Sequence, residues 1–272
     1  MISITNIIRA DMYRLFRGKA IYITFAILLA LAVLNVFISD AVVEATITIG
    51  VVTMEEANEA SLPEAPAFTG ARAAMLAVSN MGIMAFFFLP LIIIVSMTMF
   101  STGAVKNELS AGLSRTKLYA AKFILSFCLC MALMFSYAFS NFLLATISNG
   151  FGYWGGDLVP FLLKGFGALM LITLAFASLG VFLSFTTRRT AAVNGLYLAI
   201  ILIPAMIVSV VVLAFPGAIA YMDYDLFNQF HVFLYAVVNP SSQLIRSIAV
   251  CLAFIIIPTI AGVSFFRKAE IK

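Results

Sequence analysis

Residues 190–222 read TAAVNGLYLAIILIPAMIVSVVVLAFPGAIAYM, a stretch without a charged residue that directly follows Arg188 and Arg189. A helix that crosses a bilayer needs about 20 mostly apolar residues. A charged side chain at the centre of such a helix costs roughly 2.5–3.5 kcal/mol on the insertion scale. The stretch therefore predicts a membrane-spanning helix, and the same criterion can be applied to the whole chain.

Five further windows are apolar and free of charge. They lie at 20–39, between Arg72 and Lys106, between Lys122 and Asp157, between Lys164 and Arg188, and between Arg246 and Arg267. Together with residues 190–222 they predict six transmembrane helices. The expected fold class is an all-α polytopic membrane protein, formed by residues 1–272 as a single transmembrane domain.

The overall composition excludes several classes of protein. Of the 272 residues, 64% are hydrophobic and 10% are charged, and the mean hydropathy is +1.12. An ordinary soluble domain is about 45–50% apolar and about 25% charged. A soluble enzyme, a nucleic-acid-binding protein and a disordered chain are therefore excluded. The net charge of +4 then reflects topology, because basic residues mark the cytoplasmic side of a membrane protein.

The distribution of basic residues predicts that both termini are cytoplasmic. Of the sixteen Lys and Arg residues, three (Arg72, Lys164 and Arg246) fall in segments that would then lie outside. The other thirteen fall inside, in agreement with the positive-inside rule. A seventh span would place Arg267, Lys268 and Lys272 outside, so six spans is the consistent number.

Residues 1–19 are expected to form an amphipathic helix at the membrane surface. Ile4, Ile8, Met12 and Leu15 form one apolar stripe. Asp11 falls inside this stripe, where it could pair with Arg14 three residues on. The alternative is a basic flank that only sets topology.

Two segments between the predicted spans are expected on the outer side of the membrane, opposite the termini. Residues 40–78 are acidic and carry Pro63 and Pro66, which predicts helical extensions of the flanking spans joined by a loop. Residues 215–245 include a charge-free stretch, 226–245, that is too rich in Asn, Gln, His and Ser for a lipid-facing span. We expect 215–245 to form an outer, interfacial or re-entrant segment before the last span, since such backbone is tolerated where protein or water covers it.

The chain carries no recognisable catalytic chemistry. It has no phosphate-binding loop of the G-x-x-x-x-G-K-[ST] type and a single histidine, so neither an ATP site nor an H-E-x-x-H zinc site is expected. Asp223, Asp225 and His231 do not share one helical face, and Cys128, Cys130 and Cys251 sit in apolar runs, so no metal site and no cofactor are predicted. No ionisable residue falls in a predicted span, which favours a transporter driven by a separate ATPase over an ion-coupled one.

The cytoplasmic segment 101–121 holds a short amphipathic pattern. Val105, Leu109 and Leu113 recur at i, i+4 and i+8, among Lys106, Arg115, Lys117 and Lys122. Such a helix can dock into a groove on a partner and pass motion to the spans. The alternative is a solvated basic loop that enforces topology.

This segment carries a pattern, G-x-x-K-N-x-x-S-x-G-x-S-R-T-K-x-Y-x-x-K, that runs from Gly103 to Lys122. It resembles the permease subunits of type-2 ABC exporters, the class that includes permeases for bacitracin resistance and lantibiotic self-protection. Residues 9–19 resemble the family's acidic-then-basic elbow helix, and Asn239–Pro240 resembles the Asn-Pro end of its outer re-entrant segment. The chain departs from the pattern at 97–102, where many members carry an acidic residue and this one has none.

The resemblance implies a set of partners and roles. Two permease chains, two copies or a sister pair, would form the pathway in a bacterial plasma membrane, each docked on a separate subunit that holds ATP and Mg²⁺. The ATPase-coupling residues would be Lys106, Asn107, Glu108, Ser114, Arg115 and Lys117, and the elbow residues Asp11, Arg14 and Arg17. Arg115 is expected to contact the ATPase by charge or by capping its carbonyls; the alternatives are that it caps its own helix or meets lipid phosphate.

Three residues are candidates for the pathway that the cargo would take through the membrane. Asn35, Tyr137 and Asn141 are polar residues within spans and are candidates for contact with cargo, although such residues also join helices by hydrogen bonds. The resemblance implies export of an amphiphilic compound, with an antimicrobial peptide as the expected cargo. The alternative functions are an ATP-independent secondary transporter and a membrane subunit that senses a peptide through the acidic outer segment.

Overall fold

The structure is a computed structural model that describes residues 4–54, 69–79, 81–110, 112–152, 158–215, 221, 224–238 and 242–269. Within these ranges every regular element is a helix. In chain order they are α1 (Ile4–Arg17), α2 (Lys19–Met54), α3 (Gly70–Ser79), the 3₁₀ turn η1 (Met81–Ile83), α4 (Met84–Ser101), α5 (Ala104–Ser110), α6 (Arg115–Asn149), α7 (Leu158–Thr187), α8 (Thr190–Ala214), α9 (Gln229–Val238) and α10 (Ser242–Lys268).

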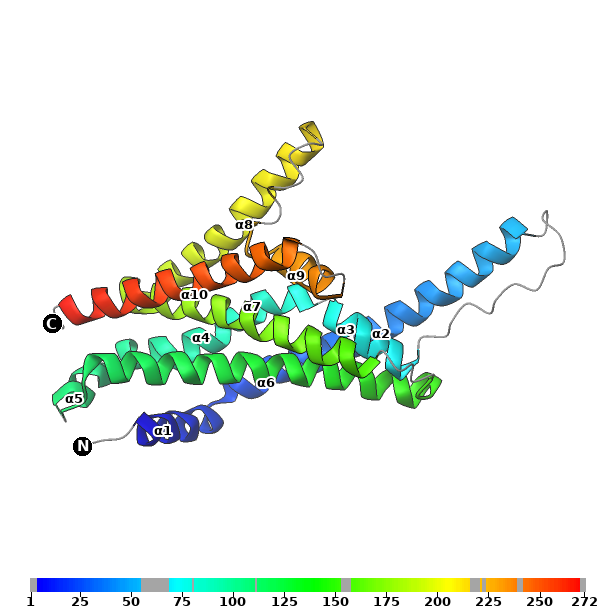
Figure 1. The fold of residues 1–272 in the computed structure, drawn as a ribbon. Coiled ribbons are helices and arrows are strands. Elements are labelled where there is room, and N and C mark those ends of the chain that lie inside the picture. Colours follow the sequence, from blue (N-terminus) through cyan, green and yellow to red (C-terminus); the bar gives the residue numbers. More distant parts are fainter. Residues whose placement is uncertain are drawn as a thin grey trace.

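Six helices of the described chain are long and apolar enough to cross a membrane: α2, α4, α6, α7, α8 and α10. Each overlaps one of the six predicted windows. The prediction of an all-helical fold with six helices able to cross a membrane is therefore confirmed for the described residues. Figure 1 places α1, α5 and both ends of the chain at one end of the bundle, and α3 and α9 toward the other.

Close packing around α7 holds the bundle together. Ala168, Ile172, Ala175 and Phe176 are buried, and α7 packs most extensively against α10. In lipid the hydrophobic effect does not drive helices together, so small residues and van der Waals contact must do so. At Gly180 an added Cβ would lie 2.7 Å from Ile92 Cδ1, so this glycine permits the close approach of α4.

The predicted loop between the first two spans is largely helical where it is described. The helix α2 continues to Met54, and α3 begins again at Gly70, so the expected extensions of the flanking spans are present. Residues 55–68, with most of the acidic side chains, lie outside the described residues. The N–H groups of Gly70 and Ala71 donate to the carbonyls of Gly150 and Phe151, each at 3.1 Å, which fixes α3 beside the end of α6.

The outer segment 215–245 contains the short helix α9, which packs against α7 and α10. Asp225 accepts a hydrogen bond from the Asn228 N–H at 3.1 Å and so caps the turn that leads into α9. Burial raises the pKa of the Asp225 carboxyl above its usual value, and backbone hydrogen bonds oppose this. Asp223 and Asn239–Pro240 lie outside the described residues.

The segment 101–121 contains α5 and the start of α6. The helix α6 begins at Arg115 and continues without a break into the third span. Residues 115–121 therefore belong to the same rigid helix as the span. The reason is local, because Ser114 caps a helix that no glycine or proline interrupts before Gly150.

Candidate functional site

The site lies where α1, α5, the start of α6 and the end of α10 meet, at the end of the bundle that carries both termini (Figure 1). Two glycines of the motif shape it. Gly103 has φ +67° and follows the end of α4, and Gly112 has φ +84° and follows α5. A Cβ at either position would meet nothing within 4 Å. These glycines are required by backbone conformation rather than by close approach.

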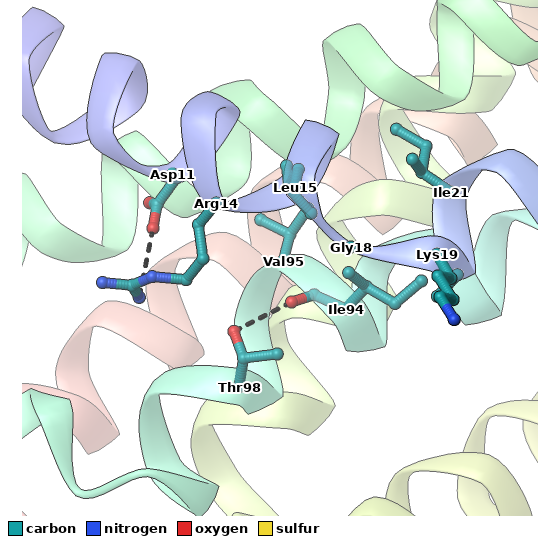
Figure 2. A pocket seen from close by; sticks show the side chains of 10 residues that line it. Asp11, Arg14, Leu15, Gly18, Lys19, Ile21, Ile94, Val95 and Thr98 are labelled. Atoms are coloured by element: carbon teal, nitrogen blue, oxygen red, sulfur yellow. Dashed lines mark hydrogen bonds and ion pairs between the residues drawn. The ribbon is translucent and has the colours of Figure 1, made fainter.

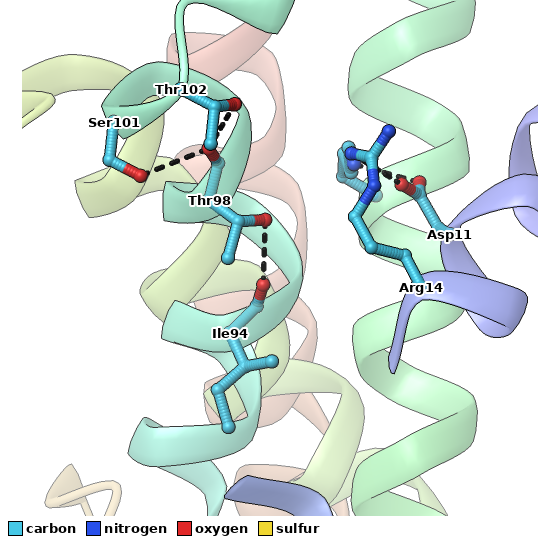
Figure 3. Close-up of polar contacts among 7 residues, drawn as sticks. Asp11, Arg14, Ile94, Thr98, Ser101 and Thr102 are labelled. Carbon is cyan, nitrogen blue, oxygen red and sulfur yellow. Dashed lines mark hydrogen bonds and ion pairs between the residues drawn. The ribbon is translucent and has the colours of Figure 1, made fainter. Parts of the chain in front are cut away.

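The ends of the helices around α5 are closed by local hydrogen bonds. At the end of α4, the hydroxyls of Ser101 and Thr102 both donate to the carbonyl of Thr98, at 3.0 and 2.8 Å (Figure 3). After α5, the Gly112 N–H donates to the Leu109 carbonyl and the Leu113 N–H to the Glu108 carbonyl, the pattern of a Schellman cap. The segment is thus a defined helical turn between two spans.

The apolar stripe of α5 faces the bundle. Val105 and Leu113 are buried, and Leu109 packs against the same core. The stripe holds α5 to its own spans, so it does not present a free apolar face to a partner. The opposite side of the segment exposes Lys106, Asn107 and Ser110.

Ser114 and Arg115 both cap helices. The Ser114 Oγ accepts a hydrogen bond from the Lys117 N–H at 3.3 Å and begins α6. The Nη1 atom of Arg115 donates to the carbonyls of Phe266, Arg267 and Ala269, at 3.0, 2.8 and 2.7 Å. Since the last carbonyls of a helix lack intrahelical partners and carry partial negative charge, the guanidinium is a favourable cap for α10.

The sequence did not predict this contact, in which Arg115 caps α10 of the same chain, up to 154 positions further on. The contact joins the start of the third span to the end of the sixth. Lys117, which belongs to the same motif, is half-buried.

A buried ion pair joins α1 to α6. The Lys122 Nζ donates to Asp11 Oδ2 at 2.7 Å, and the Lys122 side chain is 0% exposed. Arg14 also approaches Asp11, at 3.8 Å, as Figure 2 shows. The expected pairing of Asp11 with Arg14 is therefore present, but the closer partner is Lys122, which sequence reasoning missed. The signal was the lone carboxylate in an apolar stripe, because a buried charge needs a partner.

The stripe on α1 faces protein. Ile7, Asp11 and Leu15 are buried, while Ile4, Ile8 and Met12 pack against the same core. Arg17 is exposed, with its guanidinium 5.8 Å from the centre of the Tyr13 ring. Lys122, which borders the third predicted span, lies within α6, about 10 Å from its start at 1.5 Å per residue.

Glu108 places a carboxyl group of α5 near the charges of Asp11, Arg14 and Lys122. Its Oε2 atom is buried and has no hydrogen-bond partner among the described residues. Burial raises the pKa of the Glu108 carboxyl above the usual value, and the negative charge of Asp11 adds to this rise. The positive charges of Lys122 and Arg14 oppose it. We call Asp11, Arg14, Glu108 and Lys122 the charge cluster. It links the first helix, the short helix α5 and the third span.

Tyr119 completes the contact of α6 with α10. It is buried, its ring centre lies 4.8 Å from that of Phe185, and a Cβ at Gly262 would lie 2.5 Å from its hydroxyl oxygen. Gly262 thus gives α10 room to pass over this ring. Sequence reasoning placed Tyr119 in the motif without a role.

The three polar residues proposed for the pathway do come together, far from the charge cluster along α6. Asn35 Nδ2 donates to Asn141 Oδ1 at 2.7 Å, and Asn141 Nδ2 donates to the Tyr137 carbonyl at 2.8 Å. Asn141 and Tyr137 are buried. The first hydrogen bond joins α2 to α6, as the alternative interpretation of these residues predicts, and the second lies within α6.

In the part of the chain that the structure describes, no three His, Cys, Asp or Glu side chains lie close enough together to hold a metal ion. No protein-family model matches the chain, and no curated protein matches its sequence.

Proposed function

We propose that the chain is the permease subunit of an ATP-driven exporter, in which a separate subunit binds and hydrolyses ATP. One observation carries the proposal. The seven-residue helix α5 lies between two spans, buries Val105, holds the half-buried Glu108 near the charges of Lys122, Asp11 and Arg14, and exposes Lys106 and Asn107. Such an element can receive a push from a partner and pass it to several helices at once.

The transmission follows from the contacts. A displacement of α5 moves Glu108 relative to Lys122 and Asp11, which belong to α6 and α1. Arg115 joins the same end of α6 to the end of α10. Packed cores and interfaces have discrete arrangements rather than deforming continuously, so a push on one element can shift spans between two states. We propose that ATP binding in the partner supplies this push.

The proposed cargo is an amphiphilic compound, an antimicrobial peptide, moved out of a bacterial plasma membrane by two permease chains. This part of the proposal rests on the resemblance alone. Asn35 and Asn141 are hydrogen-bonded between α2 and α6, so they support the packing of these helices more directly than contact with cargo.

The first test is purification of the tagged chain from its native membrane in mild detergent, with identification of whatever stays bound. A stoichiometric soluble subunit with a phosphate-loop sequence is expected. A chain that purifies alone and intact, and that transports in liposomes by itself, would instead support the ATP-independent transporter. Loss of peptide signalling with unchanged efflux after Glu55, Glu56 and Glu59 are replaced by Gln would support the sensor.

The second test separates docking from folding. Lys106→Glu reverses an exposed charge on α5 and should lower ATPase turnover stimulated by the permease, while the protein stays folded. Arg9→Glu is the matched control, since Arg9 is also exposed but lies on α1. Equal turnover in the two variants would remove α5 from the docking surface. Arg115 is unsuited to this test, because its loss also removes the cap of α10.

A further inference from the structure

A cavity of about 260 Å³ lies between α1, the start of α2 and the last turns of α4 (Figure 2). Gly18 separates α1 from α2, and the Tyr22 hydroxyl reaches back across it to the Phe16 carbonyl at 2.8 Å. The chain therefore turns at a fixed bend, and the cavity occupies the inside of that bend.

One side of this cavity is apolar and its edge is basic. Ile21, Ile94 and Val95 give it an apolar side, with Ile21 and Val95 buried. Arg14 and Lys19 line it as well, and both are exposed at its edge. The carboxylate of Asp11 also lines it. It pairs with Lys122 at 2.7 Å and lies 3.8 Å from Arg14, so one carboxylate faces three basic residues and the rim keeps a positive charge.

The level of the cavity relative to the bilayer follows from the ends of two spans. Lys19 is the first residue of one span, and Thr98, another lining residue, lies within a turn of the end of α4 at Ser101. The ends of spans lie at the level of the lipid headgroups. The basic edge therefore sits where phosphates are, and the apolar wall where acyl chains begin.

We propose that this cavity binds an anionic phospholipid, with its phosphate on Arg14 and Lys19 and the start of one acyl chain along Ile21, Ile94 and Val95. Basic pockets between spans on the cytoplasmic side are suited to such headgroups. A bound lipid would hold α1 against α4, beside the charge cluster. The inference requires only that the chain spans a membrane, so it stands whether or not the chain is an exporter.

Native mass spectrometry of the purified chain with phosphatidylglycerol and with phosphatidylcholine tests the site. The wild-type chain should retain phosphatidylglycerol preferentially. Arg14→Gln and Lys19→Gln should each lower that preference about fivefold, the effect of one basic residue near an anionic surface. Arg9→Gln removes the same charge from an exposed position on α1 that does not line the cavity, and should leave the preference unchanged.

Two further measurements keep the test decisive. Ile94→Phe fills the apolar side without changing charge and should lower retention of phosphatidylglycerol. Glycerol phosphate, which has the anion but no acyl chain, should not compete. Equal preference in wild type, Arg14→Gln and Lys19→Gln would overturn the proposal, as would equal loss in Arg9→Gln. Competition by glycerol phosphate would overturn the acyl part and leave a simple anion site.

Discussion

The buried pair of Lys122 and Asp11 has the largest energetic consequence of any single contact in the site. A charge taken out of water is costly unless a partner compensates it, and breaking such a pair commonly costs 3–5 kcal/mol. Each member therefore requires the other. The helix α1 carries Arg9, Arg14 and Arg17, yet its buried ion pair with α6 is made by its one acidic residue, because the buried group on α6 is a lysine.

Lys122→Met should lower the free energy of unfolding by about 3 kcal/mol or more, because Asp11 is left charged and buried without its closest partner. Unfolding in mixed detergent micelles measures this. The double variant Asp11→Leu, Lys122→Met removes both charges and should recover most of the loss. If the double variant were as unstable as the sum of the single variants, the two residues would not be coupled.

Glu108 predicts a dependence of stability on pH. Its carboxyl has a raised pKa in the folded protein, so the folded state holds the proton more tightly than the unfolded state does. As pH rises above about 4.5, the free energy of unfolding should fall until the pH passes the folded pKa. Glu108→Gln should reduce this fall and leave the part contributed by Asp225, whose pKa burial also raises. Asn107→Asp, which adds a carboxylate at an exposed neighbouring position, should not create one.

At the scale of elements, the short helix α5 depends on the turns at its two ends. A seven-residue helix is too short to be stable alone. It persists because Gly103 and Gly112 turn the chain at positive φ and because Val105 and Leu113 are buried.

Gly112→Ala should cost about 1 kcal/mol, since an L-residue pays that much or more for the left-handed conformation. Gly195→Ala is the matched control: Gly195 lies within α8, with nothing within 4 Å of an added Cβ, and alanine should be neutral or stabilising there. Unfolding midpoints of the two variants provide the comparison. A larger loss at Gly195 would contradict the account of the turn.

The end of α10 depends on Arg115. Arg115→Gln should speed amide hydrogen exchange in the last turn of α10, near Phe266 and Ala269, because three carbonyls lose a charged donor. Lys117→Gln removes a charge from the same turn of α6. Among the described residues no hydrogen bond or ion pair joins the Lys117 side chain to α10, so that exchange should stay unchanged. Unchanged exchange in Arg115→Gln would show that the cap contributes nothing.

At the scale of the molecule, six helices of the described chain that are long and apolar enough to cross a membrane form a bundle with two ends. Both termini, α1 and α5 lie together at one end (Figure 1), which agrees with the side that holds most of the basic residues. In a chain whose three cysteines are replaced, Asn107→Cys should be protected from an impermeant thiol reagent added outside intact cells, and Glu59→Cys should react. The opposite pattern would invert the topology.

The sequence alone was sufficient for the number and position of the spans. Transfer of a helix into lipid depends on its own residues, so charge-free windows such as 190–222 locate the spans without knowledge of their neighbours. The turns at Gly103 and Gly112 are local features of the same kind, because a turn depends on residues that are adjacent in the chain.

The tertiary structure decided the partners. Asp11 meets Lys122 across 111 positions, and Arg115 meets the end of α10 across 154. No local pattern identifies such pairs, since several basic residues could have satisfied Asp11 and several carbonyls could have accepted from Arg115. Only the packing of α1, α6 and α10 selects among them, and it turns a motif read as a docking segment into one that also ties the chain's own helices together.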